Sequence, residues 1–157
     1  MSKSINELIK EAENQFIELK EQFSEGVLKT ISAFANTSGG VILIGVKDNK
    51  EVVGVNLKAS EFEIENMVNR IVGSLGFHPE IKVVQFKGRE LIRIDVQKSS
   101  IPIKYKGIYY KRVGNTTRAV SELTSDKVFI FDSEGRRNLH YEVLSQKMQK
   151  WRKKVLD

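Results

Sequence analysis

The stretch Ser32-Ala-Phe-Ala-Asn-Thr-Ser-Gly-Gly-Val-Ile-Leu-Ile-Gly-Val46 decides the fold of this chain. Its first residues complete the apolar stripe of a helix that Ser24 can cap. The helix is expected to stop at Asn36–Gly40, because Asn and Gly tolerate the left-handed backbone of a helix end. Val41–Val46 is almost uninterrupted aliphatic sequence, which is typical of a central strand covered on both faces. This stretch therefore predicts a helix followed by the middle strand of a sheet.

The segments on either side complete a mixed pattern. Upstream, apolar spacing predicts a helix over Asn6–Glu13, and alternation predicts a strand over Phe16–Glu21. Downstream, Glu51–Val55 is expected to be a hairpin partner, and a capping box opens a helix at Ser60. Two further hairpins are expected, Ile81–Phe86 with Leu91–Val96 and Ile103–Tyr105 with Ile108–Arg112. We predict an α+β fold in which helices pack on a mixed, mostly antiparallel sheet.

The composition disfavours several kinds of site. The 157 residues contain no cysteine and two histidines. Disulfides, thiol nucleophiles and cysteine zinc sites are therefore excluded, and a histidine metal centre is disfavoured. No apolar run approaches the roughly 20 residues of a membrane span, and the first ten residues lack a signal-peptide core. We expect a soluble, cytoplasmic protein without a membrane partner, with one domain over 1–133 and a tail over 134–157.

The charge is unevenly distributed. The chain has 26 Lys+Arg against 20 Asp+Glu, a net charge of +6, and residues 98–118 contain basic residues and tyrosines but no acid. Basic residues interleaved with aromatic ones favour a polyanion that also offers bases for stacking. An ordinary solvated surface is the alternative, and we expect one of the two adjacent tyrosines to pack inward. The expected nucleic-acid contacts are Lys104, Lys106, Tyr109, Tyr110, Lys111, Arg112 and Arg118.

Residues 134–157 predict a basic amphipathic helix. Apolar residues recur in it at helical spacing, and lysines lie largely elsewhere around the axis. The apolar residues are Tyr141, Leu144, Met148, Trp151 and Val155. Such a stripe most often docks on the parent domain or on a second copy of the chain, although a basic helix can also lie on nucleic acid.

Glu13, Glu18 and Asp48 are candidates for a metal site. Glu18 lies on a predicted strand, and Asp48 follows the buried strand at a turn. Carboxylates that converge repel one another unless a cation neutralises them, and oxygen ligands favour Mg²⁺ or Mn²⁺. An ion held in this way can polarise a phosphodiester and activate water. Lys20 shares the face of Glu18 and could stabilise the charge that develops in a transition state.

The spacing of the two glutamates sets a condition on this site. Five residues apart, they would lie on opposite faces of one strand, or about 140° apart on one helix. They can meet only if the chain breaks near Asn14-Gln15. Otherwise the three acids are ordinary surface residues and a turn former. Gly39-Gly40 lacks the Lys-Ser/Thr of a phosphate-binding loop and precedes a strand, so ATP is not an expected ligand.

Several segments together resemble the AlbA-type domain of the Schlafen family. They are Glu13…Glu18-Leu-Lys20, Ser32–Asp48, Val53-Gly54, and Ser99/Ser100–Pro102 with Gly107–Thr117, and the resemblance covers about residues 5–120. It implies a mixed sheet with flanking helices and a role on nucleic acid. In Schlafen ribonucleases three acids form a metal-dependent site that cuts structured RNA such as transfer RNA. By position in the motif, those acids are Glu13, Glu18 and Asp48.

The chain also departs from the larger Schlafen proteins. It has one copy of the lobe that they pair into a cleft, and it lacks their zinc ligands, so a homodimer would be a natural way to rebuild the cleft. Related bacterial, archaeal and viral proteins are often described as DNA-binding or transcriptional regulators, some with suggested ATP binding. The leading hypothesis is therefore a metal-dependent endoribonuclease that prefers RNA to DNA. The alternatives are a non-catalytic DNA- or RNA-binding regulator and a dimeric protein-interaction module.

Overall fold

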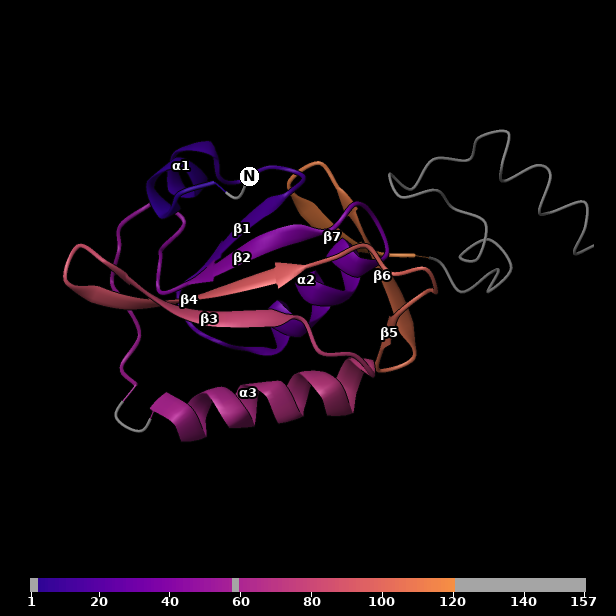
Figure 1. Cartoon of the computed structure of the whole chain (residues 1–157). Helices are drawn as coiled ribbons and strands as arrows, with labels where there is room; N and C mark the ends of the chain where they lie inside the picture. The colour runs from indigo at the N-terminus through magenta and orange to yellow at the C-terminus, as the bar shows by residue number, and fades with distance from the viewer. Residues whose placement is uncertain (1–2, 58–59, 121–157) are drawn as a thin grey trace, which may run out of the picture.

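The computed structural model describes residues 3–57 and 60–120. A four-stranded sheet with the order β1-β2-β4-β3 forms its centre (Figure 1). β1 is parallel to β2, and the other neighbours are antiparallel. Its strands are β1 (Ile17–Lys20), β2 (Gly40–Ile44), β3 (Glu80–Phe86) and β4 (Arg89–Val96). The predicted α+β class is confirmed.

Three helices and a smaller sheet surround this centre. The second sheet is antiparallel, with the order β5-β6-β7. Its strands are β5 (Lys104–Tyr105), β6 (Ile108–Val113) and β7 (Thr116–Ala119), and the helices are α1 (Ile5–Glu11), α2 (Glu25–Ala35) and α3 (Ser60–Leu75). In Figure 1, α1 and α3 lie on opposite sides of the central sheet, and the second sheet lies at one end of it.

Two apolar clusters cover the two faces of the central sheet. On one face, buried residues of α2 and α3 pack with β2, β4 and the start of the second sheet. On the other face, α1 packs on β1, β2 and β4. Successive side chains of a strand point to opposite faces, so Ile42 and Ile44 enter the first cluster and Leu43 enters the second. β2 is thus covered on both faces, as its aliphatic sequence predicted.

The junction between α2 and β2 requires two glycines. Gly39 has a φ of +75°, and a Cβ atom at this position would lie 2.7 Å from the backbone oxygen of Val96. A Cβ atom on Gly40 would lie 2.7 Å from the Phe34 ring. The preceding Asn36 donates hydrogen bonds of 2.8 Å to the backbone oxygens of Ile103 and Tyr110, which ties the second sheet to α2. This junction therefore sets where the second sheet lies relative to β1.

Two elements differ from the prediction, and the ends of several others are shifted by one or two residues. Glu51–Val55 does not form a strand, because only the isolated bridge between Val46 and Val52 pairs there. Gly45, with a φ of +108°, turns the chain, and its oxygen accepts hydrogen bonds from the amides of Val53 and Gly54. β7 was not predicted as a separate strand, since its sequence has no clear alternation.

The tail predicted over 134–157, and residues 121–133 before it, lie outside the described residues. Among the helices within residues 3–57 and 60–120, none is long and apolar enough to cross a membrane.

Candidate functional site

A turn between α1 and β1 brings Glu13 next to Glu18. α1 ends at Glu11, and the side chain of Asn14 then closes a tight turn. Asn14 Oδ1 accepts a 2.7 Å hydrogen bond from the amide of Phe16, and Nδ2 donates to the backbone oxygen of Glu11 at 3.2 Å. The side-chain oxygen of Asn commonly fixes a turn in this way. The chain therefore breaks where the spacing required it, and Glu13 lies close enough to Glu18 for each carboxyl group to act on the other.

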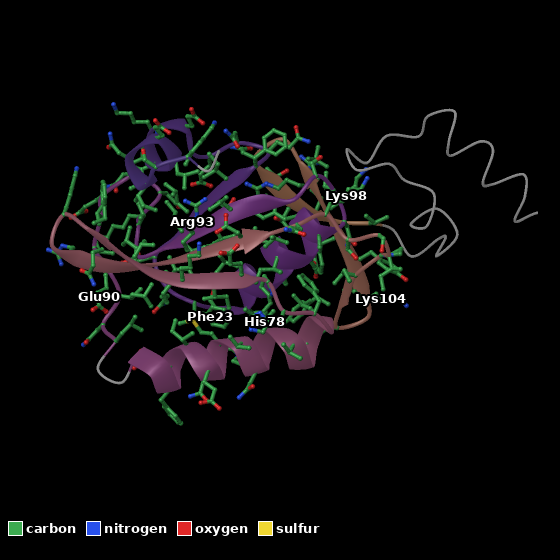
Figure 2. All side chains as sticks on the ribbon, viewed as in Figure 1. Phe23, His78, Glu90, Arg93, Lys98 and Lys104 are labelled. Carbon is green, nitrogen blue, oxygen red and sulfur yellow. The ribbon has the colours of Figure 1, made fainter. Side chains whose placement is uncertain are left out.

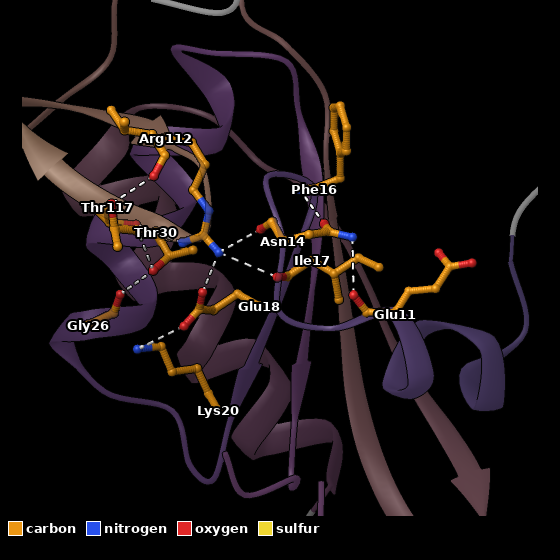
Figure 3. Close-up of polar contacts among 12 residues, drawn as sticks. Glu11, Asn14, Phe16, Ile17, Glu18, Lys20, Gly26, Thr30, Arg112 and Thr117 are labelled. Atoms are coloured by element: carbon orange, nitrogen blue, oxygen red, sulfur yellow. Dashed lines mark hydrogen bonds and ion pairs between the residues drawn. The ribbon is translucent and has the colours of Figure 1, made fainter. Parts of the chain in front are cut away.

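Arg112 reaches this turn from β6. Its Nη2 lies 2.5 Å from Glu18 Oε2 and also donates to the backbone oxygens of Asn14, at 3.0 Å, and Ile17, at 3.4 Å (Figure 3). Its Nη1 donates to Thr117 Oγ1 at 3.2 Å. The side chain of Arg112 is 1% exposed. One guanidinium group thus joins β6, β7, β1 and the turn before β1.

The burial of Arg112 corrects its expected role. We predicted that Arg112 would contact a nucleic-acid backbone, but its guanidinium is enclosed and serves as the counter-ion of Glu18. A buried carboxylate is costly without such a partner. The guanidinium carbon also lies 5.0 Å from the centre of the Phe34 ring. Arg112 is therefore a positioning residue of the site.

Lys20 and Asp48 lie beside the glutamate pair. Lys20 Nζ is 3.7 Å from Glu18 Oε1, on the same face of β1 as predicted. Asp48 is exposed in the loop that follows β2, and it lies close enough for its charge to act on Glu13. The structure therefore places all four residues in one region, with Glu18 at its buried end.

The pKa of Glu13 is raised from 4.5 to about 7. The largest cause is partial burial, followed by the negative charge of Glu18, the hydrogen bond with Glu18 and the charge of Asp48. The positive charge of Arg112 acts in the opposite direction. Two neighbouring carboxyls in a partly desolvated site cannot both ionise easily, so the pair holds one proton up to near-neutral pH.

The fit of these acids to a metal ion is incomplete. Carboxylate oxygens are the ligands that Mg²⁺ and Mn²⁺ prefer. In the part of the chain that the structure describes, however, no three Asp, Glu, His or Cys side chains are arranged to hold a metal ion. Glu18 already faces the cations of Arg112 and Lys20. The site brings two carboxyls together and a third near them, without a preformed metal cage.

The predicted nucleic-acid contacts are divided between two faces of the second sheet. Cross-strand partners share a face. Lys104 is opposite Tyr109, and Lys111 is opposite Arg118, so these four residues lie on the face away from α2, which we call the outer face. On it, Lys104 and Arg118 are exposed and Tyr109 is buried. The alternate residues Tyr110 and Arg112 face α2. Lys106 is exposed at the β5–β6 turn, where it forms a 2.8 Å ion pair with Glu25.

Neither candidate tyrosine is freely exposed. Tyr109 is 9% exposed, and the Lys104 ammonium lies 4.9 Å from the centre of its ring. Tyr110 is half-buried, with the ammonium of Lys29 at 5.8 Å. Near the glutamate pair, the exposed aromatic side chain is instead Phe16, at 49%. Phe16 was expected at the start of the strand, but it lies just before β1, and its exposure was not predicted.

These features define a class of protein: a small α+β domain in which a carboxylate pair, held by a buried arginine, lies beside a basic sheet face. The chain belongs to the Schlafen AlbA_2 family, whose model matches residues 13–121. The match begins at the first glutamate of the pair and ends just after β7.

The chain is also similar to individual proteins, in sequence or in structure. A Ureaplasma parvum protein, named as an uncharacterized ATP-binding protein, is 37% identical over 59 residues, or 35% of this chain and 16% of that protein. The chain therefore spans only a small part of that relative. The DIP2311 protein of Corynebacterium diphtheriae has a TM-score of 0.61 at 18% identity, over 74% of this chain and 25% of the other.

A second solved structure is the N-terminal domain of a Nitrosomonas europaea protein named for its relation to the ATP-dependent DNA helicase RecG. It has a TM-score of 0.52 at 21% identity, over 76% of this chain and 95% of the other. At these identities, both solved structures support the fold alone.

Proposed function

We propose that this domain binds nucleic acid, with RNA preferred to DNA, through the outer face of the second sheet. The observation that carries this proposal is that Lys104 and Arg118 are exposed on one face of the same sheet that supplies Arg112 to the carboxylate pair. Phosphate groups would meet the cations on this face, and the net charge of +6 favours a polyanionic ligand. Membership of the Schlafen AlbA_2 family supports the same ligand class.

The test is a comparison of two double variants of equal charge. K104Q/R118Q removes two cations from the outer face, whereas K82Q/K87Q removes two exposed lysines from β3 and the turn that follows it. That turn lies at the opposite end of the molecule from the second sheet (Figure 1). We expect K104Q/R118Q to weaken binding of a labelled single-stranded RNA about tenfold or more at 100 mM salt, and K82Q/K87Q to weaken it much less. Equal losses in the two variants would contradict the proposed face.

Cleavage of structured RNA such as transfer RNA is a second candidate function. The observation that favours it is the meeting of Glu13 with Glu18, with Asp48 and Lys20 beside them. In this proposal the three acids would hold Mg²⁺ or Mn²⁺ once Asp48 turns toward the pair, and the ion would supply the chemistry of water activation. The ammonium of Lys20 would stabilise negative charge on the phosphate.

The cleavage test uses labelled transfer RNA with Mn²⁺. We expect the wild type to cut it, D48A to lose the activity, and K20A to retain a reduced rate. Activity that is equal in wild type and D48A, or absent from both, removes the enzymatic function and leaves binding alone.

A homodimer also remains a proposal. The apolar stripe of residues 134–157 is its basis, through Leu144, Met148 and Trp151. Truncation after Ser133, followed by size-exclusion chromatography with light scattering, tests it. We expect the full chain to elute as a dimer and the truncated chain as a monomer.

A further inference from the structure

A concave region lies on the α1 side of the turn that carries Asn14. It is a cavity of about 360 Å³ between α1 and the β1–β2 end of the central sheet. Phe16, Leu8 and Val41 form apolar parts of its lining, and Arg93, Asp95 and Asn14 form polar parts. A volume in this range, with a mostly apolar wall and a few fixed polar groups, suits a small planar ligand.

Phe16 is an exposed aromatic ring on a rigid backbone. Its side chain is at the rim of the cavity and the residue is 49% exposed. Its amide donates to Asn14 Oδ1 at 2.7 Å, and its backbone oxygen accepts a 2.8 Å hydrogen bond from the amide of Val41. Both peptide groups around Phe16 are therefore fixed. Because the backbone is already fixed, only the ring of Phe16 loses conformational freedom when it stacks on a base.

The polar part of the lining is also fixed. Arg93, labelled on β4 in Figure 2, pairs with Asp95 through two hydrogen bonds, Nε to Oδ2 at 2.9 Å and Nη2 to Oδ1 at 3.1 Å. Its Nη1 donates to the backbone oxygen of Lys3 at 3.0 Å. The side chain of Arg93 is 11% exposed and that of Asp95 is 27% exposed. Asp95 thus offers acceptor oxygens, on a rigid strand, to a group that donates hydrogen bonds.

The cavity and the carboxylate pair share the same turn. Asn14 and Ile17 line the cavity, and the backbone oxygens of both residues accept hydrogen bonds from Arg112 on the other side. A strand of nucleic acid that passes the glutamate pair could therefore place a neighbouring base on the Phe16 side of the turn. The cationic outer face described above would hold its phosphates.

We propose that this cavity is a nucleobase subsite, in which one unpaired base stacks on Phe16 and directs its polar edge toward the Arg93–Asp95 pair. The inference rests on the proposed function, because the subsite would take a base of the nucleic acid bound by the second sheet. It adds a preference that the basic face alone would not give. A duplex keeps its bases stacked, so the subsite selects single strands, loops or unpaired ends.

The test compares two exposed phenylalanines. F16A removes the proposed stacking ring, and F62A removes a ring of α3 that is 65% exposed and does not line the cavity. We expect F16A to weaken binding of a single-stranded RNA dodecamer roughly 5- to 150-fold, the range of one lost base–aromatic stack. F62A should bind as the wild type does, and F16W should restore most of the affinity. Unchanged thermal melting of F16A checks that the fold is intact.

A second measurement separates the subsite from the basic face. Titration of the full chain with AMP, GMP, CMP and UMP is followed by NMR, with shifts expected at the Phe16 ring and at the methyl groups of Leu8 and Val41. Wild type and F16A that bind the dodecamer equally, with no shifts at the cavity, would overturn the subsite while the proposed binding function stands. A wild type that binds no RNA or DNA would overturn both.

Discussion

Arg112 and Glu18 form the most enclosed ion pair in the described residues, with side chains that are 1% and 10% exposed. Removal of one partner leaves the other charge buried, which costs about 3–5 kcal/mol, whereas removal of both avoids that cost. We therefore expect R112M to destabilise the domain by about 3–5 kcal/mol, and E18Q/R112M by about 1–3 kcal/mol less than the sum of the two single variants. Urea denaturation at pH 7 measures all four proteins.

An exposed ion pair provides the control for this comparison of single and double variants. Lys82 and Glu80 lie 2.7 Å apart, but both side chains are 59% exposed. Water screens such a pair, so the effects of K82Q and E80Q on the free energy of unfolding should simply add. If the effects of R112M and E18Q are as additive as those of the exposed pair, Arg112 does not position Glu18 in the way that we describe.

Glu13 gives the site a pH dependence of known sign. Its pKa is about 7 in the folded chain and 4.5 when unperturbed, so the native state holds a proton that the unfolded state has already lost between these values. Its contribution to the free energy of unfolding is therefore complete below about pH 4.5 and is lost as the pH rises from there through about 7. In EDTA, E13Q should become more stable than wild type as the pH rises through this window.

Thermal melts at half-unit steps from pH 4.5 to 8 measure the effect. The comparison is with E65Q, which alters an exposed glutamate of α3. The difference between E13Q and wild type should grow from pH 4.5 to 7 and then level off, and E65Q shows what the loss of one exposed carboxyl does by itself. A flat difference for E13Q would mean that burial and the neighbouring acids do not raise the pKa of Glu13 in the folded chain.

At the scale of the elements, the α2–β2 junction depends on the absence of a side chain at Gly40. A methyl group there would lie 2.7 Å from Cδ1 and Cε1 of Phe34 and 2.8 Å from the backbone oxygen of Phe16. We expect G40A to cost about 1–3 kcal/mol, because a packed core yields little to an added group. G73A is the matched control on α3, where nothing lies within 4 Å of the added Cβ atom.

The control variant G73A should raise the free energy of unfolding, whereas G40A lowers it. Alanine is favoured over glycine in a helix interior, so G73A should stabilise the domain by about 0.5–1 kcal/mol. Urea denaturation of both variants gives the comparison. A G40A variant as stable as the wild type would show that the junction can relax, and the close approach of α2 to β2 would not then be a constraint on the sequence.

The elements with a strong local pattern were predictable from the sequence. The unbroken aliphatic sequence of β2 predicted that both of its faces are buried. Glycine at the bend of the β3–β4 and β5–β6 hairpins predicted their turns. The break at Asn14 was required by the spacing of the glutamates and is made by the side chain of Asn14 itself. Local signals were sufficient for these features, because the residues that cause them are close in the sequence.

The features that the sequence did not predict depend on contacts between distant segments. Arg112 lies 94 residues from Glu18, and nothing in its own segment distinguishes a buried counter-ion from an exposed phosphate contact. The loop after Gly45 is similar, since the amide of Val55 donates to the distant backbone oxygen of Glu90 and the expected strand pairing does not form. The exposure of Phe16 was not predicted, because it depends on the cavity that α1 leaves beside the residue.

Over the whole molecule, a basic chain carries a locally acidic site. The net charge is +6, yet Glu13, Glu18 and Asp48 gather within one region, so nucleic acid bound nearby would feel both attraction and repulsion. Asp48 is exposed, and D48N can therefore remove one repulsive charge without disturbing the core. In EDTA at 50 mM salt we expect D48N to bind single-stranded RNA roughly two- to fivefold more tightly than wild type, with the difference fading at 500 mM salt.

If the three acids hold a metal, Mn²⁺ should make the wild type bind RNA more tightly than D48N does. The ion would convert the repulsive site of the wild type into a cationic one, and its binding should tighten, whereas D48N lacks one of the ligands and should gain little. Fluorescence anisotropy with and without Mn²⁺ measures both proteins, and E65Q serves as an exposed control of the same charge change. If D48N remains the tighter binder in Mn²⁺, the acids do not form a metal site, and their effect on nucleic acid is repulsion alone.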